Sequence, residues 1–206
     1  MPILRHSPDP PDKAFDLATP GHVYWKLLWE LGHLKKSLVE EASEHAGLRF
    51  ESAYHAYNFA VTAWHLIDWV WAASDQGTRD YISKFFGGAE MARKAHLYNE
   101  IAAKYRPIHI CGQIANGSKH YIAAWGDDPA VKAVVRWVKR EPVEEADDRV
   151  RFQFKKELAI RDGDGEAQPA ITVFKEAVRA WDHMLGTWGF IEGRYIGPDS
   201  DPPPWA

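Results

Sequence analysis

The hydrophobic positions along the chain follow two different spacings, which predict helices first and strands later. From Thr19 to Gly47 apolar residues recur every three or four positions, after a Thr19-Pro20 pair that is typical of a helix start. This pattern predicts an amphipathic helix. A second helix is predicted over 49–74, and because apolar residues occur on most of its faces, we expect it to be the central helix of a bundle.

Shorter helices are predicted after this central one. One follows Thr78 and is ended by two consecutive glycines, and another covers 90–105. Pro107 either kinks that helix or begins the next one, which we expect to run to about residue 124. The sequence leaves both alternatives open.

The spacing then changes to an alternation of apolar and polar residues. Segment 150–160 alternates as a half-buried strand does, 161–166 has the glycines and aspartates of a turn, and 171–173 begins a return strand. Segment 131–138 fits a third strand or a helix. The stripe of apolar residues over 174–189 predicts the last helix.

Together these elements predict one mainly α domain. We expect a helical bundle over 19–125, then a small antiparallel β-hairpin or three-stranded β-element over 131–174, and a C-terminal helix over 174–189. The proline-containing ends predict a flexible N-terminal arm over 1–18 and a tail over 190–206. The 206 residues are enough for a single sizeable core.

Composition and charge narrow the classes of function. Hydrophobic residues make up 46% and charged residues 26%, an ordinary globular balance, and ten Trp predict an aromatic core. The net charge of −4 lacks the basic surplus of a general DNA-binding protein, so any contact with RNA requires a local site. Cys111, the only cysteine, excludes an internal disulfide. Neither a signal-peptide pattern nor an apolar run of membrane length occurs, so we expect a cytoplasmic protein without a membrane partner.

Two predicted helices carry polar residues in helical register. On the second helix these residues are spaced 3, 4 and 3 apart, and Asp68 extends the stripe: His55, Asn58, Thr62 and His65. On the helix after Pro107 they are spaced 4, 3 and 4 apart: His109, Gln113, Asn116 and His120. If the two helices pack together, the stripes converge on a polar pocket suited to acid–base chemistry or metal binding. Alternatively, they satisfy each other's hydrogen bonds and fix the packing register.

A metal site is one interpretation of these stripes. Neutral imidazoles with one carboxylate suit zinc or iron, and the candidate ligands are His55, His65, Asp68, His109 and His120. The HExxH string of zinc proteases and the paired Glu-x-x-His segments of two-iron bundles do not occur.

The segment 114–121, Ile-Ala-Asn-Gly-Ser-Lys-His-Tyr, resembles the motif of the HEPN superfamily. These are small helical bundles of toxin–antitoxin and antiviral defence systems, and active members cut RNA without metal at a dimer interface. Asn116 and His120 match the Asn-x-x-x-His core of the motif, whereas Ala115 occupies the place of its Arg. More loosely, the Asn-x-x-Lys-His string and Trp181-Asp182 in the final helix resemble uncharacterised bacterial proteins of similar size.

The resemblance implies a homodimer that acts on RNA. It implies that Asn116 and His120 are catalytic, and His55 is the candidate for a second proton-transfer group. The Arg would stabilise charge on the reacting phosphate, so its absence requires another cation. The candidates for contact with substrate, which include the two available cations, are Asn58, Gln113, Lys119 and Arg106.

Three functions therefore remain as predictions. The first is a HEPN-like domain that acts on RNA or nucleotide, in a bacterial toxin or defence module, as a metal-independent ribonuclease without a cofactor. The second is a non-catalytic helical module that binds a partner or dimerises. The third is a metal-dependent enzyme that uses the paired His stripes.

Overall fold

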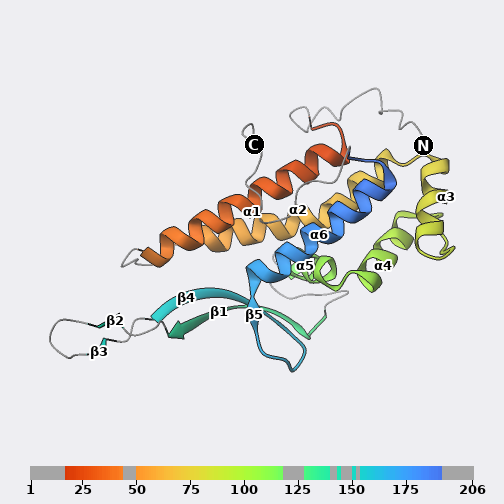
Figure 1. The fold of residues 1–206 in the computed structure, drawn as a ribbon. Coiled ribbons are helices and arrows are strands. Elements are labelled where there is room, and N and C mark those ends of the chain that lie inside the picture. Colours follow the sequence, from red (N-terminus) through yellow and green to blue (C-terminus); the bar gives the residue numbers. More distant parts are fainter. Residues whose placement is uncertain are drawn as a thin grey trace.

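The chain folds as a helical bundle with a β-hairpin beside it (Figure 1). The computed structural model describes residues 17–43, 50–117, 128–139, 143–144, 150–151 and 154–191. Within these residues the helices are α1 (Pro20–Ser43), α2 (Glu51–Ala73), α3 (Gln76–Phe85), α4 (Lys94–Lys104), α5 (Arg106–Gly117) and α6 (Ala170–Trp188). The strands are β1 (Val131–Lys139), β2 (Val143–Glu144), β3 (Val150–Arg151), β4 (Phe154–Asp162) and β5 (Gln168–Pro169). The prediction of a mainly α domain with a small antiparallel β-element before the last helix is confirmed.

The core lies between α1, α2 and α6, which run alongside one another in Figure 1. The ring of Phe59 in α2 stacks on that of Phe174 in α6, with centroids 4.4 Å apart. Trp181 of α6 is fully buried, and its indole Nε1 donates a hydrogen bond to the Ala63 carbonyl oxygen over 3.0 Å. This contact satisfies the one polar atom of a large apolar side chain, as burial requires.

Helix α5 packs against α2 through a glycine. A Cβ atom added at Gly112 would lie 2.7 Å from two ring atoms of Trp64, which is closer than side chains approach one another. The absence of a side chain at this position therefore lets the helices come together. Trp64 also contacts the ring of Tyr98 in α4, so this tryptophan links three helices.

The sheet has the strand order β1-β4-β5 and is antiparallel. Val131 pairs with Asp162 and Lys139 with Phe154, so β1 and β4 are matched over their full lengths. The short strands β2 and β3, which lie between β1 and β4 in sequence, pair with each other. Ile160 of β4 is buried in the helical core, so the sheet packs against the bundle at this residue.

The prediction that 171–173 forms a return strand is wrong. Ile171 and Val173 lie in α6, which begins at Ala170, and only the short β5 precedes it. Val173 is buried together with Phe174, so it already belongs to the apolar stripe of the helix. The long partner of β4 is instead β1, and of the two alternatives for 131–138 the strand is the right one.

Two shorter helices also begin at other residues than predicted. Helix α3 begins at Gln76, because the Asp75 side chain accepts a hydrogen bond from the Thr78 backbone N–H over 2.8 Å and caps the helix there. Helix α4 begins at Lys94 rather than at residue 90. Pro107 is the second residue of α5, which is the alternative in which it begins a helix.

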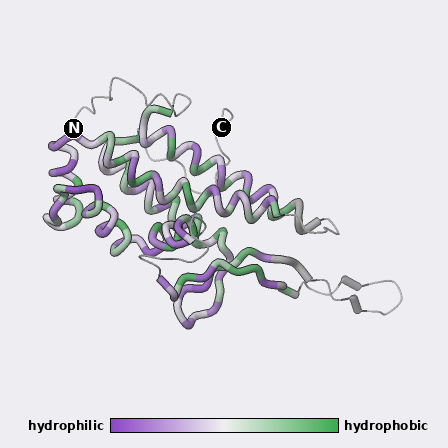
Figure 2. The backbone as a smooth tube through the Cα atoms, turned by 180° about the vertical axis from the view of Figure 1, so that it is seen from behind, coloured by the Kyte–Doolittle hydropathy of each residue, from purple (hydrophilic) through white to green (hydrophobic). Residues whose placement is uncertain are grey.

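Several expected features lie outside the described residues: most of the arm over 1–18, the continuation of α5 to residue 124, and the tail from residue 192 onward. In the part of the chain that is described, no helix is both long enough and apolar enough to cross a bilayer. Figure 2 shows why, because hydrophilic and hydrophobic residues alternate along every long helix.

Candidate functional site

The polar stripe of α2 faces α1, where a buried carboxylate meets it. Glu30 of α1 is only 3% exposed. Lys26, one turn earlier, donates a hydrogen bond to Glu30 Oε1 over 3.0 Å and another to Thr62 Oγ1 of α2 over 2.6 Å. An ionised carboxylate is costly to remove from water unless it is paired and hydrogen-bonded, and Lys26 meets that need on one oxygen.

The second oxygen of Glu30 faces His55. His55 Nδ1 lies 3.7 Å from Glu30 Oε2, and both atoms are buried with no hydrogen-bond partner among the described residues. The Glu30 side chain is 4% exposed, whereas that of His55 is 27% exposed. A proton on Nδ1 would point at the carboxylate and leave the opposite nitrogen of the ring as the one that exchanges protons with a ligand.

Two further aromatic side chains of α1 lie beside this pair. The rings of His33 and His55 are stacked, with centroids 5.3 Å apart and planes 20° from parallel. Trp29 lies next to His33 with a centroid distance of 3.8 Å, and its own surface is 41% exposed. The result is a row of three rings that runs from solvent to the Glu30–His55 pair.

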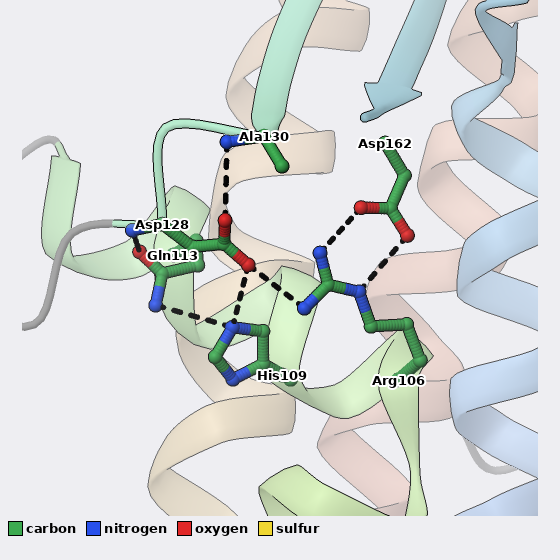
Figure 3. Close-up of polar contacts among 6 residues, drawn as sticks. All are labelled: Arg106, His109, Gln113, Asp128, Ala130 and Asp162. Carbon is green, nitrogen blue, oxygen red and sulfur yellow. Dashed lines mark hydrogen bonds and ion pairs between the residues drawn. The ribbon is translucent and has the colours of Figure 1, made fainter. Parts of the chain in front are cut away.

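A second polar cluster joins α5 to the sheet, and Figure 3 shows its geometry. Arg106 Nη1 lies 2.8 Å from Asp128 Oδ2, and its Nε donates a hydrogen bond to Asp162 Oδ2 over 2.9 Å. A further bond from Nη2 makes the contact with Asp162 bidentate. The guanidinium holds the pKa of both carboxyl groups below their ordinary value and has its own pKa raised, chiefly by the bond to Asp162.

His109 and Gln113 complete this second cluster. His109 Nε2 lies 3.2 Å from Asp128 Oδ2 and 3.4 Å from the Gln113 side-chain nitrogen. The side-chain oxygen of Gln113 accepts a hydrogen bond from the Asp128 backbone N–H over 2.9 Å. Asp128 Oδ1 accepts a hydrogen bond from the Ala130 backbone N–H over 3.0 Å. Since Nε2 cannot donate to Asp128 and accept from Gln113 at once, the ionised carboxylate favours the donor form.

The expected convergence of the two stripes is wrong for His55 and His109. Helices α2 and α5 do pack together, but α2 turns Trp64 toward α5. Nine residues separate Trp64 from His55, which places them on opposite sides of the helix at about 100° per residue. His55 therefore meets Glu30 of α1, and His109 meets Asp128. A central helix has neighbours on both sides, and the spacing within it cannot say which neighbour a stripe faces.

Three of the candidate metal ligands, His55, Asp68 and His109, have different partners. Asp68 accepts a hydrogen bond from Lys94 Nζ of α4 over 2.6 Å, and burial together with a hydrogen bond to Asp68 raises the pKa of Tyr98. His65 lies in α2 three residues before Asp68, and His120 lies outside the described residues. In the described part of the chain no group of three or more His, Cys, Asp or Glu side chains is arranged to hold a metal ion.

The HEPN-like motif is described only in part. Ala115, at the place of the family's Arg, is fully buried, and Asn116 is half-buried near the end of α5. His120 and Lys119 lie outside the described residues. Of the two cations expected to replace the Arg, Arg106 is bound to two carboxylates. Of the other proposed substrate contacts, Asn58 is exposed on α2 and Gln113 binds the Asp128 backbone.

Sequence reasoning missed four residues of these clusters: Glu30, His33, Asp128 and Asp162. Glu30 carries a signal, because it stands four residues after Lys26 and next to Leu31 in the apolar register of a predicted helix. The two aspartates look like ordinary turn residues, and only the fold brings them to Arg106.

Comparison with known proteins adds no relative: no family model, no curated protein and no solved structure gives a significant match to this chain.

Proposed function

We propose that this chain is a HEPN-like domain that acts on RNA or nucleotide by proton transfer, with His55 as a proton-transfer group. The observation that carries the proposal is the contact between His55 and the buried carboxylate of Glu30, whose closest atoms are 3.7 Å apart. His55 was selected from sequence for this role, and a carboxylate behind an imidazole is what the role requires.

The chemistry follows from the geometry of this pair. Glu30 Oε2 lies 3.7 Å from His55 Nδ1, so a small movement on ligand binding would form the hydrogen bond that orients the imidazole ring. General acid–base groups of this kind contribute about 10²–10⁴-fold to a reaction rate. Asn116 and His120 remain the second part of the proposed site, as the HEPN resemblance implies, within a toxin or defence module that works as a homodimer and needs no metal.

A non-catalytic module that binds a partner or dimerises is the second candidate, and two observations favour it. Ala115 is fully buried, so the motif position that would contact phosphate is part of the core. Arg106 is held between Asp128 and Asp162, so its charge is already neutralised. Under this alternative the cluster around Arg106 serves only to attach the sheet.

The test is cleavage of a labelled, unstructured RNA in the presence of a chelator. We expect wild-type protein to cut it, His55→Ala and His120→Ala to lose at least 100-fold in rate, and Glu30→Gln to lose less while the pH profile of the reaction shifts. His183→Ala is the matched control, because His183 is an exposed histidine of α6. Thermal midpoints measured in parallel separate loss of chemistry from loss of folding.

One outcome would count against the enzyme, and another against the role of His55. If wild-type protein leaves RNA and nucleotides intact under all conditions, the binding module becomes the better account. If His55→Ala cuts as fast as wild type, His55 has only a structural role in the interface between α1 and α2.

A further inference from the structure

We propose that Lys132 and Arg161, on the face of the sheet that points away from the bundle, bind a phosphate group of the RNA backbone. The inference rests on the proposed function and names where its substrate is held. A chain with a net charge of −4 needs a local basic site to hold RNA. The two long strands carry a basic surplus. Three of the nine residues of β1 are basic and none is acidic, and β4 has three basic and two acidic residues.

The first step is where the two cations lie. Lys132 and Arg161 are directly opposite each other in the pairing of β1 with β4, so their side chains are on the same face of the sheet. Ile160, the neighbour of Arg161, is buried in the helical core. Because successive side chains of a strand point to opposite faces, the two cations point away from that core. Both are exposed.

The second step is that no acidic side chain neutralises the two cations. Both acidic residues of β4 already have partners, since Asp162 binds Arg106 and Glu157 accepts a hydrogen bond from Arg136 Nε over 2.6 Å. The exposed acidic residues of the turn over 163–166 form no ion pair with the two cations. Within the described residues, therefore, the two opposed positive charges have no counter-charge.

The third step asks whether protection of the sheet edge explains the pair. In the order β1-β4-β5, β1 is an edge strand, and lysine on such a strand is a common means of preventing pairing with another chain. This accounts for Lys132 but not for Arg161, which is on the central strand. Like charges directly opposite each other in an antiparallel pair destabilise a sheet. A bound anion replaces this repulsion with two attractive contacts.

The fourth step is the kind of anion. Two long basic side chains that start from directly opposite positions can both reach one phosphate group, whose oxygens accept several charged hydrogen bonds. The neighbours of the pair on the same face are Val134, which is half-buried, and Ala159, which is buried. A protein partner needs exposed apolar surface at the centre of its contact, and these two neighbours offer little. Phosphate contacts need only charge, which favours RNA over an acidic protein.

The experiment is a fluorescence-polarisation titration of a labelled single-stranded RNA at several salt concentrations. We expect the double variant Lys132→Gln, Arg161→Gln to weaken binding about 10-fold at low salt. The slope of log K against log salt should become shallower by about 0.7, which corresponds to the loss of one phosphate contact. The thermal midpoint of this variant should not fall, because the substitutions remove a repulsion between exposed groups.

The matched control is the double variant Lys84→Gln, Arg179→Gln. Both residues are exposed, on α3 and α6, so this variant has the same change in net charge but an unaltered sheet. We expect it to bind RNA with nearly wild-type affinity. Polyglutamate is the competitor that represents an acidic protein, and we expect it to displace the labelled RNA far less effectively than unlabelled RNA does.

The outcomes separate this inference from the proposed function, because RNA cleavage is measured independently of binding. If the Lys132 and Arg161 variant binds RNA no more weakly than the control variant, the phosphate site is wrong, whether or not the protein cuts RNA. If polyglutamate competes as well as unlabelled RNA, the face binds an acidic protein and the inference is also wrong. RNA that is bound through the pair but never cut would support the site and contradict the enzyme. If the wild-type protein neither binds nor cuts RNA, both proposals are wrong.

Discussion

At the scale of single residues, the side chains that matter most are polar groups inside an apolar bundle. Glu30 is held by Lys26 on one oxygen and faces His55 with the other. This arrangement explains how a carboxylate can be buried in the interface of two helices. One of its oxygens is hydrogen-bonded to Lys26 and the other lies near His55. It also leaves His55 as the only member of the pair that reaches solvent to any extent.

Cys111 shows the opposite case, a reactive group type that burial makes inert. It is fully buried in α5, and burial raises the pKa of its thiol well above the ordinary value. Because the thiolate is the reactive form, we expect native protein to react with a thiol reagent far more slowly than a free cysteine does. The measurement is the rate of reaction with Ellman's reagent, with and without denaturant. Rapid modification of the folded protein would show that α5 opens readily.

At the scale of elements, the contact between α2 and α5 depends on Gly112, and a pair of glycine substitutions tests it. Gly112→Ala places a Cβ 2.7 Å from the Trp64 ring, so we expect a loss of about 1–3 kcal/mol in the free energy of unfolding. Gly186→Ala, in α6, meets nothing within 4 Å, and we expect it to stabilise by up to about 1 kcal/mol. Chemical denaturation of both variants gives the two values. Equal effects would mean that Trp64 moves aside without cost.

The elements also show how much of the fold is predictable from the sequence. Helices α1, α2 and α6 were predictable because their apolar stripes repeat locally over many turns. The pairing of β4 was not, because alternation marks a strand but does not name its partner, and β1 lies farther away in sequence than 171–173. The same limit applies to the site. His55 was predictable from its register in α2, whereas Glu30 is in another helix and no spacing links the two.

At the scale of the whole molecule, one basic residue binds both long strands of the sheet to the bundle. Arg106 begins α5 and binds Asp128, which precedes β1, and Asp162, which ends β4. Both ends of the hairpin that face the bundle are therefore tied to the same guanidinium (Figure 3). Ile160 adds apolar contacts with the helical core to these ion pairs.

This joint predicts how acid and mutation act on the molecule. Since the pKa values of Asp128 and Asp162 are lowered in the folded state, their contribution is fully present above the ordinary value of about 4 and is lost as pH falls through the folded values. The groups are partly exposed, so we expect about 1 kcal/mol or less from each pair. Arg106→Gln should therefore lower stability slightly at neutral pH and flatten its decline below about pH 4.

Hydrogen exchange locates the effect of the same variant. Amide protons of β1 and β4 should exchange faster in Arg106→Gln than in wild type, while those of α1, α2 and α6 keep their protection, because the bundle core does not depend on Arg106. Lys94→Gln is the control, since it removes an ion pair with Asp68 that lies wholly among the helices. Faster exchange in the helices and the sheet alike would mean that sheet and bundle unfold as a single unit, with Arg106 acting on the whole of it rather than on their junction.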